Sequence, residues 1–445
     1  MPVAALERPT SATHRPRRSQ WLTLAVVMVA SLTVAVAVVR GWDVQADPRV
    51  KLGAAPLVGE WRLRLSWRLL PVAVLAGGAV VWLPGLAARL AFRRLLVVVA
   101  TGASGLALAL AASDGGAAVL APVVHPTEYW ANLATLPAAS EVLREWGVDF
   151  LLDYSVHVKG HPPGFVLALQ ALDGIGLGAP WVAGALSFLG AGATAVAVVV
   201  GVRRVVSEPA ARAVAPFAVV VPYLVWMGTS ADAVFTAVTA WGLVAAVAAL
   251  QATTTAARRI LAAVAGTALA GALFLTYGTA MFLVLVVAVV LLLPGVSRRA
   301  RAEVAAAASA AAAVVTLAFA AGGFWWFDGL RATQTLYWWG TAQFRPGSYF
   351  WYANLAAAMI AVGPAVVVGV ASLRARAVWL LVGGALTALV LADLSQYSRA
   401  EVERIWLLFF PWLVPAVVAL RRPRAWLAVQ AVVTVGLQAT LVSKW

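Results

Sequence analysis

Runs of apolar residues long enough to cross a membrane recur along the whole chain, and the first of them lies at residues 21–40. About 20 such residues span the hydrocarbon core of a bilayer. Because no water is available there, the backbone of each spanning segment must satisfy its own hydrogen bonds, as a helix does. With 63% hydrophobic and 11% charged residues, the chain is too apolar for a soluble domain. The sequence therefore predicts an all-α, polytopic membrane protein that is embedded in a lipid bilayer.

The apolar runs predict about 13 transmembrane helices, with boundaries accurate to a few residues. They lie at 21–40, 69–87, 95–112, 180–201, 211–227, 233–250, 258–276, 278–294, 303–322, 350–371, 377–393, 406–420 and 425–442. Residues 1–20 before them are a polar, basic tail, and residues 21–445 are expected to form a single transmembrane domain. No inverted pair of interrupted spans, the pattern of many transporters, is visible in these runs.

The positions of the arginines orient the spans, because cytoplasmic loops are rich in Lys and Arg. With the N-terminal tail inside the cell, the following side chains fall in cytoplasmic loops: Arg89, Arg93, Arg94, Arg203, Arg204, Arg212, Arg258, Arg259, Arg298, Arg299, Arg301, Arg374, Arg376, Arg421, Arg422 and Arg424. Of the 18 acidic residues, only Glu7, Glu208 and Glu303 lie on that side. Membrane topology thus explains the formal charge of +15, and no nucleic-acid partner is needed. We expect a multi-pass inner (plasma) membrane protein whose chemistry takes place on the outer face.

Two external segments are candidates for a catalytic loop. The loop at 113–179 carries three of the four histidines, and its apolar part at 165–178 is too short to cross, so we expect a juxtamembrane or re-entrant helix there. The loop at 41–68 carries Asp43 and Asp47, but its five basic residues contradict the orientation rule. The sequence leaves open which of the two loops holds the site.

The motif "HPTEYW" at residues 125–130 opens the longer loop. His125 and Glu128 are candidates for general acid and base catalysis, which needs a titratable group placed on the reacting atom. The motif fits equally well as the first turn of a helix, where the helix dipole stabilises Glu128.

A second polar cluster, "DYSVHVKGHPPGFVLAL", closes the same loop at residues 153–169. Asp153, His157, Lys159 and His161 could bind an anion or a metal, or form a polar interfacial loop. The Gly and the Pro-Pro pair around His161 argue against a helical two-histidine zinc face, so the pattern favours a phosphate clamp that includes Lys159. No cofactor is certain, and a divalent cation is left open.

Two further motifs place charges beside predicted spans. Asp232 in "MGTSADAVF" lies at an outer turn, either as a functional carboxylate or as a helix cap together with Ser230. Glu403 and Arg404 in "EVERIW" stand directly before a late span, where Arg404 could hold a lipid phosphate and Glu403 could orient it. The alternative for the latter pair is a surface ion pair of small energetic value.

An aromatic segment at 323–349 is expected to be a Trp-rich external loop. It contains Trp325, Trp326, Trp338 and Trp339 together with Arg345. An interfacial aromatic belt accounts for some of these indoles. Flat aromatic faces also suit sugar rings or an isoprenoid chain, and an Arg fork suits phosphate, which favours a binding function.

The order of these motifs resembles the GT-C superfamily of integral membrane glycosyltransferases, in particular the branch of aminoarabinose transferases and protein mannosyltransferases. "HPTEYW" is similar to the acidic motif that opens the first external loop of that superfamily, and "GHPPGFVLAL" is similar to its closing Lys-Pro-Pro-Leu element. "TSADAVF" and "EVERIW" look like later elements, the last of them as in actinobacterial members. Two differences stand out: Thr127 occupies a position where Asp is common, and two spans precede the motif loop instead of one.

The resemblance implies a polyprenyl-phosphate sugar donor and inversion at the anomeric carbon, with Glu128 as the base. Asp232 and His125 would complete the catalytic group. The lipid phosphate would be held by Lys159, His161, Arg345 and Arg404. Sugar or lipid would be held by Asp153, His157, Trp325, Trp326, Trp338, Trp339 and Glu403.

The sequence thus favours a glycosyltransferase that moves a mannose- or arabinose-type sugar from a polyprenyl-phosphate donor to an acceptor of the cell envelope. Since the chain contains no Walker loop and no dinucleotide-binding turn, a soluble nucleotide donor is disfavoured. A transporter or flippase for a lipid-linked sugar is the main alternative and predicts charged groups near the middle of the membrane. A non-catalytic membrane scaffold would not need charges collected on one side.

Overall fold

The structure, a computed structural model, describes residues 18–228 and 230–443. Most of the basic tail expected at residues 1–20 lies outside the described residues. Helices account for nearly all of the regular structure, as the sequence predicts, and the strands are only two residues long.

Eight helices in the described part of the chain are long and apolar enough to cross a membrane. They are α1 (Arg18–Gln45), α2 (Leu70–Arg89), α3 (Phe92–Ala112), α9 (Pro180–Val205), α11 (Ala231–Leu250), α12 (Thr255–Leu275), α14 (Arg298–Ala321) and α18 (Arg376–Ser395). The outer faces of α1 and α14 expose rows of apolar side chains, such as Met28 and Leu317, which suits contact with lipid. The chain is a multi-pass membrane protein.

Two further apolar segments are pairs of helices joined at a sharp bend. Helices α16 (Gly347–Val362) and α17 (Pro364–Ser372) meet at 103°, and α19 (Val402–Ile405) with η7 (Trp406–Leu408) meets η8 (Phe410–Trp412) and η9 (Val414–Ala419) at 66°. If each bent pair is one span, the total rises from eight to ten, so the expected count of 13 is not confirmed.

The remaining three predicted spans are helical, but they are not among the helices that are long and apolar enough to cross a membrane. Residues 211–227 divide into α10 (Glu208–Val219) and η5 (Pro222–Trp226), because Pro222 has no backbone N–H to continue the helix. Helix α13 (Thr279–Leu292) has only 14 residues, and α20 (Pro423–Thr440) begins among exposed arginines. Apolar composition at these positions reflects burial inside the protein as well as contact with lipid.

The bend between α16 and α17 shows how an interrupted span keeps its backbone satisfied. Gly363 adopts a positive φ of 81°, and a Cβ there would lie 2.6 Å from the amide of Gln430. Gln430 donates to the carbonyl of Val362 at 2.6 Å and accepts from the N–H of Ala365 at 3.2 Å. The buried glutamine therefore replaces hydrogen bonds that the break in the helix removes.

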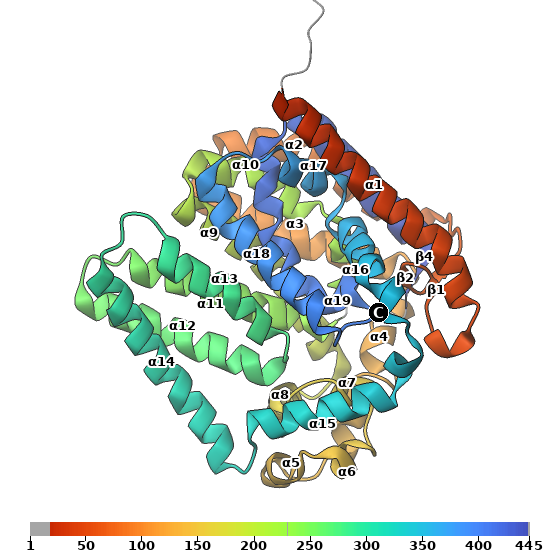
Figure 1. Cartoon of the computed structure of the whole chain (residues 1–445), viewed down its shortest axis with the longest axis vertical. Coiled ribbons are helices and arrows are strands. Elements are labelled where there is room, and N and C mark those ends of the chain that lie inside the picture. The colour runs from red at the N-terminus through yellow and green to blue at the C-terminus, as the bar shows by residue number, and fades with distance from the viewer. Residues whose placement is uncertain (1–17, 229, 444–445) are drawn as a thin grey trace, which may run out of the picture.

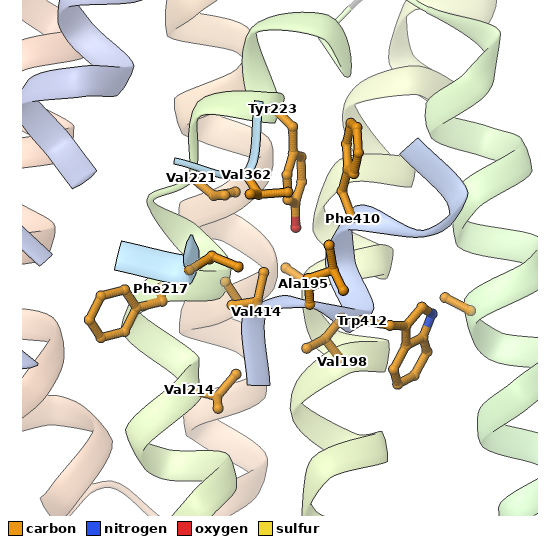
Figure 2. Close-up of a cluster of buried hydrophobic side chains, with 14 of the residues drawn as sticks. Ala195, Val198, Val214, Phe217, Val221, Tyr223, Val362, Phe410, Trp412 and Val414 are labelled. Carbon is orange, nitrogen blue, oxygen red and sulfur yellow. The ribbon is translucent and has the colours of Figure 1, made fainter. Parts of the chain in front are cut away.

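A large apolar core lies where α9, α10, η5 and η8 converge. Figure 2 shows Tyr223, Phe410 and Trp412 in this core, with smaller side chains such as Ala195 and Val198 among them. All five side chains are nearly inaccessible to solvent. This packing holds the irregular segments η5 and η7 to η9 inside the bundle.

Short helices gather at one end of the bundle, at the bottom of Figure 1. The loop between α3 and α9 forms η3 (Ala117–Val119), α4 (Ala121–Val124), η4 (Trp130–Thr135), α5 (Ala139–Glu145), α6 (Val148–Leu151), α7 (Val156–Lys159) and α8 (Gly164–Gly174). Helix α8 is the short helix that the sequence predicts at 165–178. The segment at 323–349, predicted as a Trp-rich external loop, contains the helices α15 (Trp326–Trp339) and η6 (Thr341–Phe344).

The first loop, between α1 and α2, packs onto the bundle instead of extending away from it. It contains η1 (Pro48–Val50), β1 (Gly53–Ala54), β2 (Leu57–Val58), β3 (Glu60–Trp61) and η2 (Trp67–Leu69). Strand β1 pairs with β2, and β3 pairs antiparallel with β4 (Leu441–Val442) near the C-terminus. Leu52 and Leu57 are buried, so this loop is part of the folded core.

Candidate active site

Glu128 and His157 form the centre of the candidate site. Glu128 lies in the turn between α4 and η4, and its Oε1 is 2.7 Å from Nδ1 of His157 on α7. Both side chains are buried, with 9% and 3% of their surfaces exposed. The backbone N–H of His157 donates to the carbonyl of Thr127 at 3.2 Å, which ties α7 directly to the turn that carries Glu128.

Asn132 bridges the turn that carries Glu128 and the residues just before α7. Its side-chain amide donates to the carbonyl of Glu128 at 2.7 Å, and its oxygen accepts from the N–H of Ser155 at 3.0 Å. The hydroxyl of Ser155 donates to the same Glu128 carbonyl at 3.3 Å. Asn132 therefore sets the distance between the two halves of the loop, a role that the sequence analysis missed.

Burial shifts the titration of the central pair in opposite directions. It raises the pKa of Glu128 to about 7, and nearby Arg404 opposes part of this rise. Burial also lowers the pKa of His157 to about 3, so the imidazole is neutral at physiological pH. A carboxyl group with a pKa near 7 is suited to accept a proton during a reaction.

A second buried pair lies beside the first and joins α11 to α19. Asp232 Oδ2 is 3.0 Å from Nη1 of Arg404, and each side chain is only 4% exposed. Ser230 is the N-cap of α11, and its hydroxyl also donates to Asp232 Oδ2 at 2.8 Å. The cap that the sequence suggested is thus provided by Ser230, while Asp232 neutralises a buried arginine.

Glu401 continues the charged network. Its two carboxylate oxygens lie 3.1 Å from Nη2 of Arg345 and 3.8 Å from Nη2 of Arg404. Ala400 and Glu401 both adopt left-handed backbone conformations, with φ values of 68° and 62°. Such conformations cost about 1–3 kcal/mol per non-glycine residue and persist only where surrounding contacts hold them.

Asn354 on α16 provides those contacts. Its amide donates to the carbonyl of Ser398 at 2.7 Å and to Asp393 Oδ1 at 2.8 Å, while its oxygen accepts from the N–H of Ala400 at 3.2 Å. Asn354 is 1% exposed. Asn354 and Asp393 are polar side chains inside apolar helices, and this pattern in the sequence could have marked them as functional positions.

Arg345 and Glu403 contact protein groups at the positions where the sequence analysis expected substrate. Arg345 donates to the carbonyls of Val50 and Arg399 as well as to Glu401. Glu403 Oε1 accepts from the N–H of Val58 at 2.9 Å. Glu403 therefore anchors the first loop to α19, and Arg345 anchors it to the segment that precedes α19.

The other polar candidates of the longer loop divide between the site and the surface. His161 Nδ1 lies 2.9 Å from the carbonyl of His157, and burial lowers the pKa of His161 to about 4, so its ring is neutral. His125 Nδ1 contacts Thr127 Oγ1 at 2.7 Å. Lys159 ends α7 and is half-buried, whereas Asp153 is exposed.

The four indoles of the aromatic segment are not gathered around Glu128. Trp325 and Trp339 are 47% and 61% exposed. Trp326 donates to the carbonyl of Leu273 at 2.9 Å, and Cζ of Arg399 lies over the Trp338 ring, 4.7 Å from its centroid. This arrangement fits an interfacial aromatic helix as well as a binding surface.

A small cavity adjoins the central pair. Its volume is about 20 Å³, which is room for about one water molecule. Glu128, Tyr129 and Ser187 line it together with the apolar residues Val123, Trp130, Phe165, Leu169, Ala183 and Ala231. Glu128 lines this cavity, whereas His161 and Arg404 do not.

The described residues contain no group of three or more His, Cys, Asp or Glu side chains that could hold a metal ion. Arg404, which is 3% exposed, is a buried cation near Glu128.

Comparisons with known proteins leave the family of the chain open. No protein-family model and no curated protein matches it. Among solved structures, the chain is similar to ArnT from Cupriavidus metallidurans in the apo state, with a TM-score of 0.45 and 15% sequence identity. The similarity covers 69% of this chain and 56% of that chain, so the match spans little more than half of the length of ArnT. The function is therefore inferred from the geometry of the site.

Proposed function

We propose that this chain is a membrane glycosyltransferase of the GT-C type that transfers a sugar from a polyprenyl-phosphate donor to an acceptor of the cell envelope. The observation that carries the proposal is the buried contact between Glu128 and His157, beside a cavity and next to the buried Asp232–Arg404 pair. A neutral histidine at one carboxylate oxygen leaves the other oxygen available to take a proton.

In the proposed reaction, Glu128 accepts the proton of an acceptor hydroxyl. The oxygen of that hydroxyl forms a bond to the anomeric carbon from the face opposite the phosphate. The bond between the anomeric carbon and the phosphate oxygen breaks, and the lipid phosphate leaves with the electron pair. The configuration at the anomeric carbon is inverted.

Arg404 is the best candidate to balance the charge of the departing phosphate. It is permanently cationic, it already balances Asp232 at 3.0 Å, and a planar guanidinium can donate to two anions at once. His161 supplies no positive charge at neutral pH, since burial lowers its pKa to about 4. Lys159, half-buried at the end of α7, is a second candidate cation.

The distribution of charge supports an external site in the plasma membrane. Exposed arginines end α2 and α9 and begin α12, α14 and α18, whereas Glu128 and Asp232 belong to the opposite ends of the same bundle. By the positive-inside rule, the arginine end faces the cytoplasm. The loop at 113–179 then contributes the base on the outer side. The first loop holds Glu403 and Arg345 through the backbone of Val58 and Val50.

The bent spans favour a second candidate, a transporter or flippase for a lipid-linked sugar. Interrupted helices near the centre of a bundle are common in transporters, and two candidate spans are interrupted here. The strongest cluster of buried charge, however, lies at the ends of helices, where a transferase needs it.

In the test, membranes that contain the protein are incubated with radiolabelled polyprenyl-phosphate mannose or arabinose. Glu128→Gln should lower sugar transfer by about 100-fold or more, the usual contribution of a general base, while expression and thermal stability persist. Glu141→Gln, an exposed glutamate of the same loop, is the matched control. Transfer by Glu128→Gln at the wild-type rate would rule out Glu128 as the base. Movement of labelled lipid between leaflets without sugar transfer would support the flippase.

A further inference from the structure

Tyr129 follows Glu128 directly, and its ring is held on several sides. Phe165 contacts the ring edge-on at a centroid distance of 4.9 Å, and His161 does so at 5.6 Å. His157 stacks on it at 5.9 Å, and Phe235 of α11 lies at 6.4 Å. Tyr129 is only 3% exposed. Its ring therefore has one well-defined position between α7, α8 and α11.

The packing explains the ring of Tyr129 but leaves its hydroxyl group unexplained. Within the part of the chain that the structure describes, the hydroxyl has no hydrogen-bond partner. A buried polar atom without a partner destabilises the folded state, whereas Phe would fill the same space without that cost. Folding alone does not account for this oxygen atom.

The small cavity beside Glu128 suggests what the hydroxyl is for. Tyr129 and Glu128 both line it, and most of the other lining side chains are apolar. Ser187, the remaining polar residue, donates its hydroxyl hydrogen to the carbonyl of Ala183 at 3.2 Å. Glu128 and Tyr129 are therefore the two lining residues that carry a carboxyl group and, within the described residues, a hydroxyl group without a partner, the groups that an entering oxygen atom would need.

We propose that Tyr129 and Glu128 form a subsite for a single hydroxyl group, that of the sugar acceptor. The Tyr129 O–H donates to one lone pair of the acceptor oxygen, and Glu128 accepts the acceptor's proton. The second lone pair of the same oxygen then attacks the anomeric carbon. The apolar walls restrict the subsite to one hydroxyl at a time, which selects a single position of a polyhydroxy acceptor. This inference rests on the proposed function.

The test compares Tyr129→Phe with Tyr223→Phe, a control that removes a hydroxyl from another buried tyrosine, which belongs to the separate apolar core of Figure 2. The assay uses polyprenyl-phosphate mannose as donor and octyl mannoside as acceptor, with the acceptor concentration varied. Tyr129→Phe should lower kcat/KM for the acceptor about 10-fold or more, as expected when a site loses a hydrogen bond to a substrate hydroxyl. The KM for the donor should stay within about twofold, and the unfolding temperature should be equal or higher, because an unsatisfied polar atom is removed.

Wild-type kinetics in Tyr129→Phe would overturn the inference while leaving the proposed function intact. A fall in its unfolding temperature well beyond that of Tyr223→Phe would also overturn it, since the hydroxyl would then have a structural partner. If the wild-type protein transfers neither mannose nor arabinose from the polyprenyl-phosphate donor, the proposed function fails and this inference fails with it.

Discussion

Asp232 and Arg404 are 172 residues apart in the chain, yet Asp232 Oδ2 lies 3.0 Å from Nη1 of Arg404 in the interior of the protein. The pair joins the first turn of α11 to α19, and the Glu128 turn lies beside it. Removing one member would leave the other charge buried and unbalanced. The pair therefore supports both the fold and the electrostatic environment of the site.

We expect Asp232→Asn and Arg404→Gln each to destabilise the protein by about 3–5 kcal/mol, the usual effect of breaking a buried pair from one side. The double variant should lose less than the sum of the two losses, because no isolated charge remains. Thermal unfolding in detergent, followed by tryptophan fluorescence, measures all three. Strictly additive losses would show that the two side chains do not interact.

The activity should depend on pH through Glu128. Because its pKa is raised to about 7, the group is mostly protonated at pH 5.5 and mostly ionised at pH 8.5. A base must be ionised, so kcat/KM should rise with pH and level off above a midpoint near 7. His157, with a pKa lowered to about 3, should add no second inflection in this range. Initial rates between pH 5 and 9 test this expectation, and a flat profile contradicts it.

The raised pKa of Glu128 should make the folded state less stable as pH rises, while activity increases. A carboxyl group whose pKa rises on folding favours the folded state when protonated, and this contribution is lost as pH rises from its ordinary value of 4.5 through about 7. The wild-type protein should therefore lose stability relative to Glu128→Gln between pH 5 and 8. Parallel unfolding curves of the two proteins at several pH values provide the comparison.

Asn354→Leu should loosen the segment that positions Glu401 and Arg404. The change leaves Ser398, Asp393 and Ala400 without their partner, and each unsatisfied buried group costs about 1–3 kcal/mol. Amide hydrogen exchange should increase at residues 396–404 before the rest of the bundle is affected. Thr387→Val, an exposed position on α18, is the control. Unchanged exchange at 396–404 would show that Asn354 does not hold this turn.

Cysteine labelling tests the orientation, because the chain contains no native cysteine. Asp153→Cys lies on the exposed surface of the longer loop, and Thr253→Cys lies in the exposed turn between α11 and α12. With the site outside, a membrane-impermeant thiol reagent should label Asp153→Cys in intact cells and Thr253→Cys only after permeabilisation. The reverse pattern would place the site in the cytoplasm.

The motifs of the longer loop show what can be predicted from local sequence. "HPTEYW" and the segment around His157 each suggested chemistry, and the short helix α8 was expected from the length of its apolar run. The specific contact between Glu128 and His157 was not predictable, since it depends on Asn132 and Thr127 bridging two parts of the loop.

The late motif "EVERIW" shows where local sequence is not sufficient to predict the contacts of charged residues. Its charges suggested a lipid phosphate site, and Arg404 keeps that role in the proposal, but Glu403 binds the backbone of the first loop. Arg345, from the aromatic segment, binds the same loop. Nothing in the local pattern indicates that residues near 50 and 58 pack against residues near 400. Long-range packing of this kind decides which charged side chains remain available for a substrate.

The sequence by itself determined the helical membrane architecture, because apolar runs and arginine-rich loops obey rules that act within one segment. The predicted count of 13 spans is not confirmed, since eight to ten segments of the described residues have the length and composition of a span. Only the tertiary structure decided which polar residues meet: Glu128 with His157, and Asp232 with Arg404. Buried charges must be balanced by whichever partners the folded chain brings within reach, and those partners are distant in sequence.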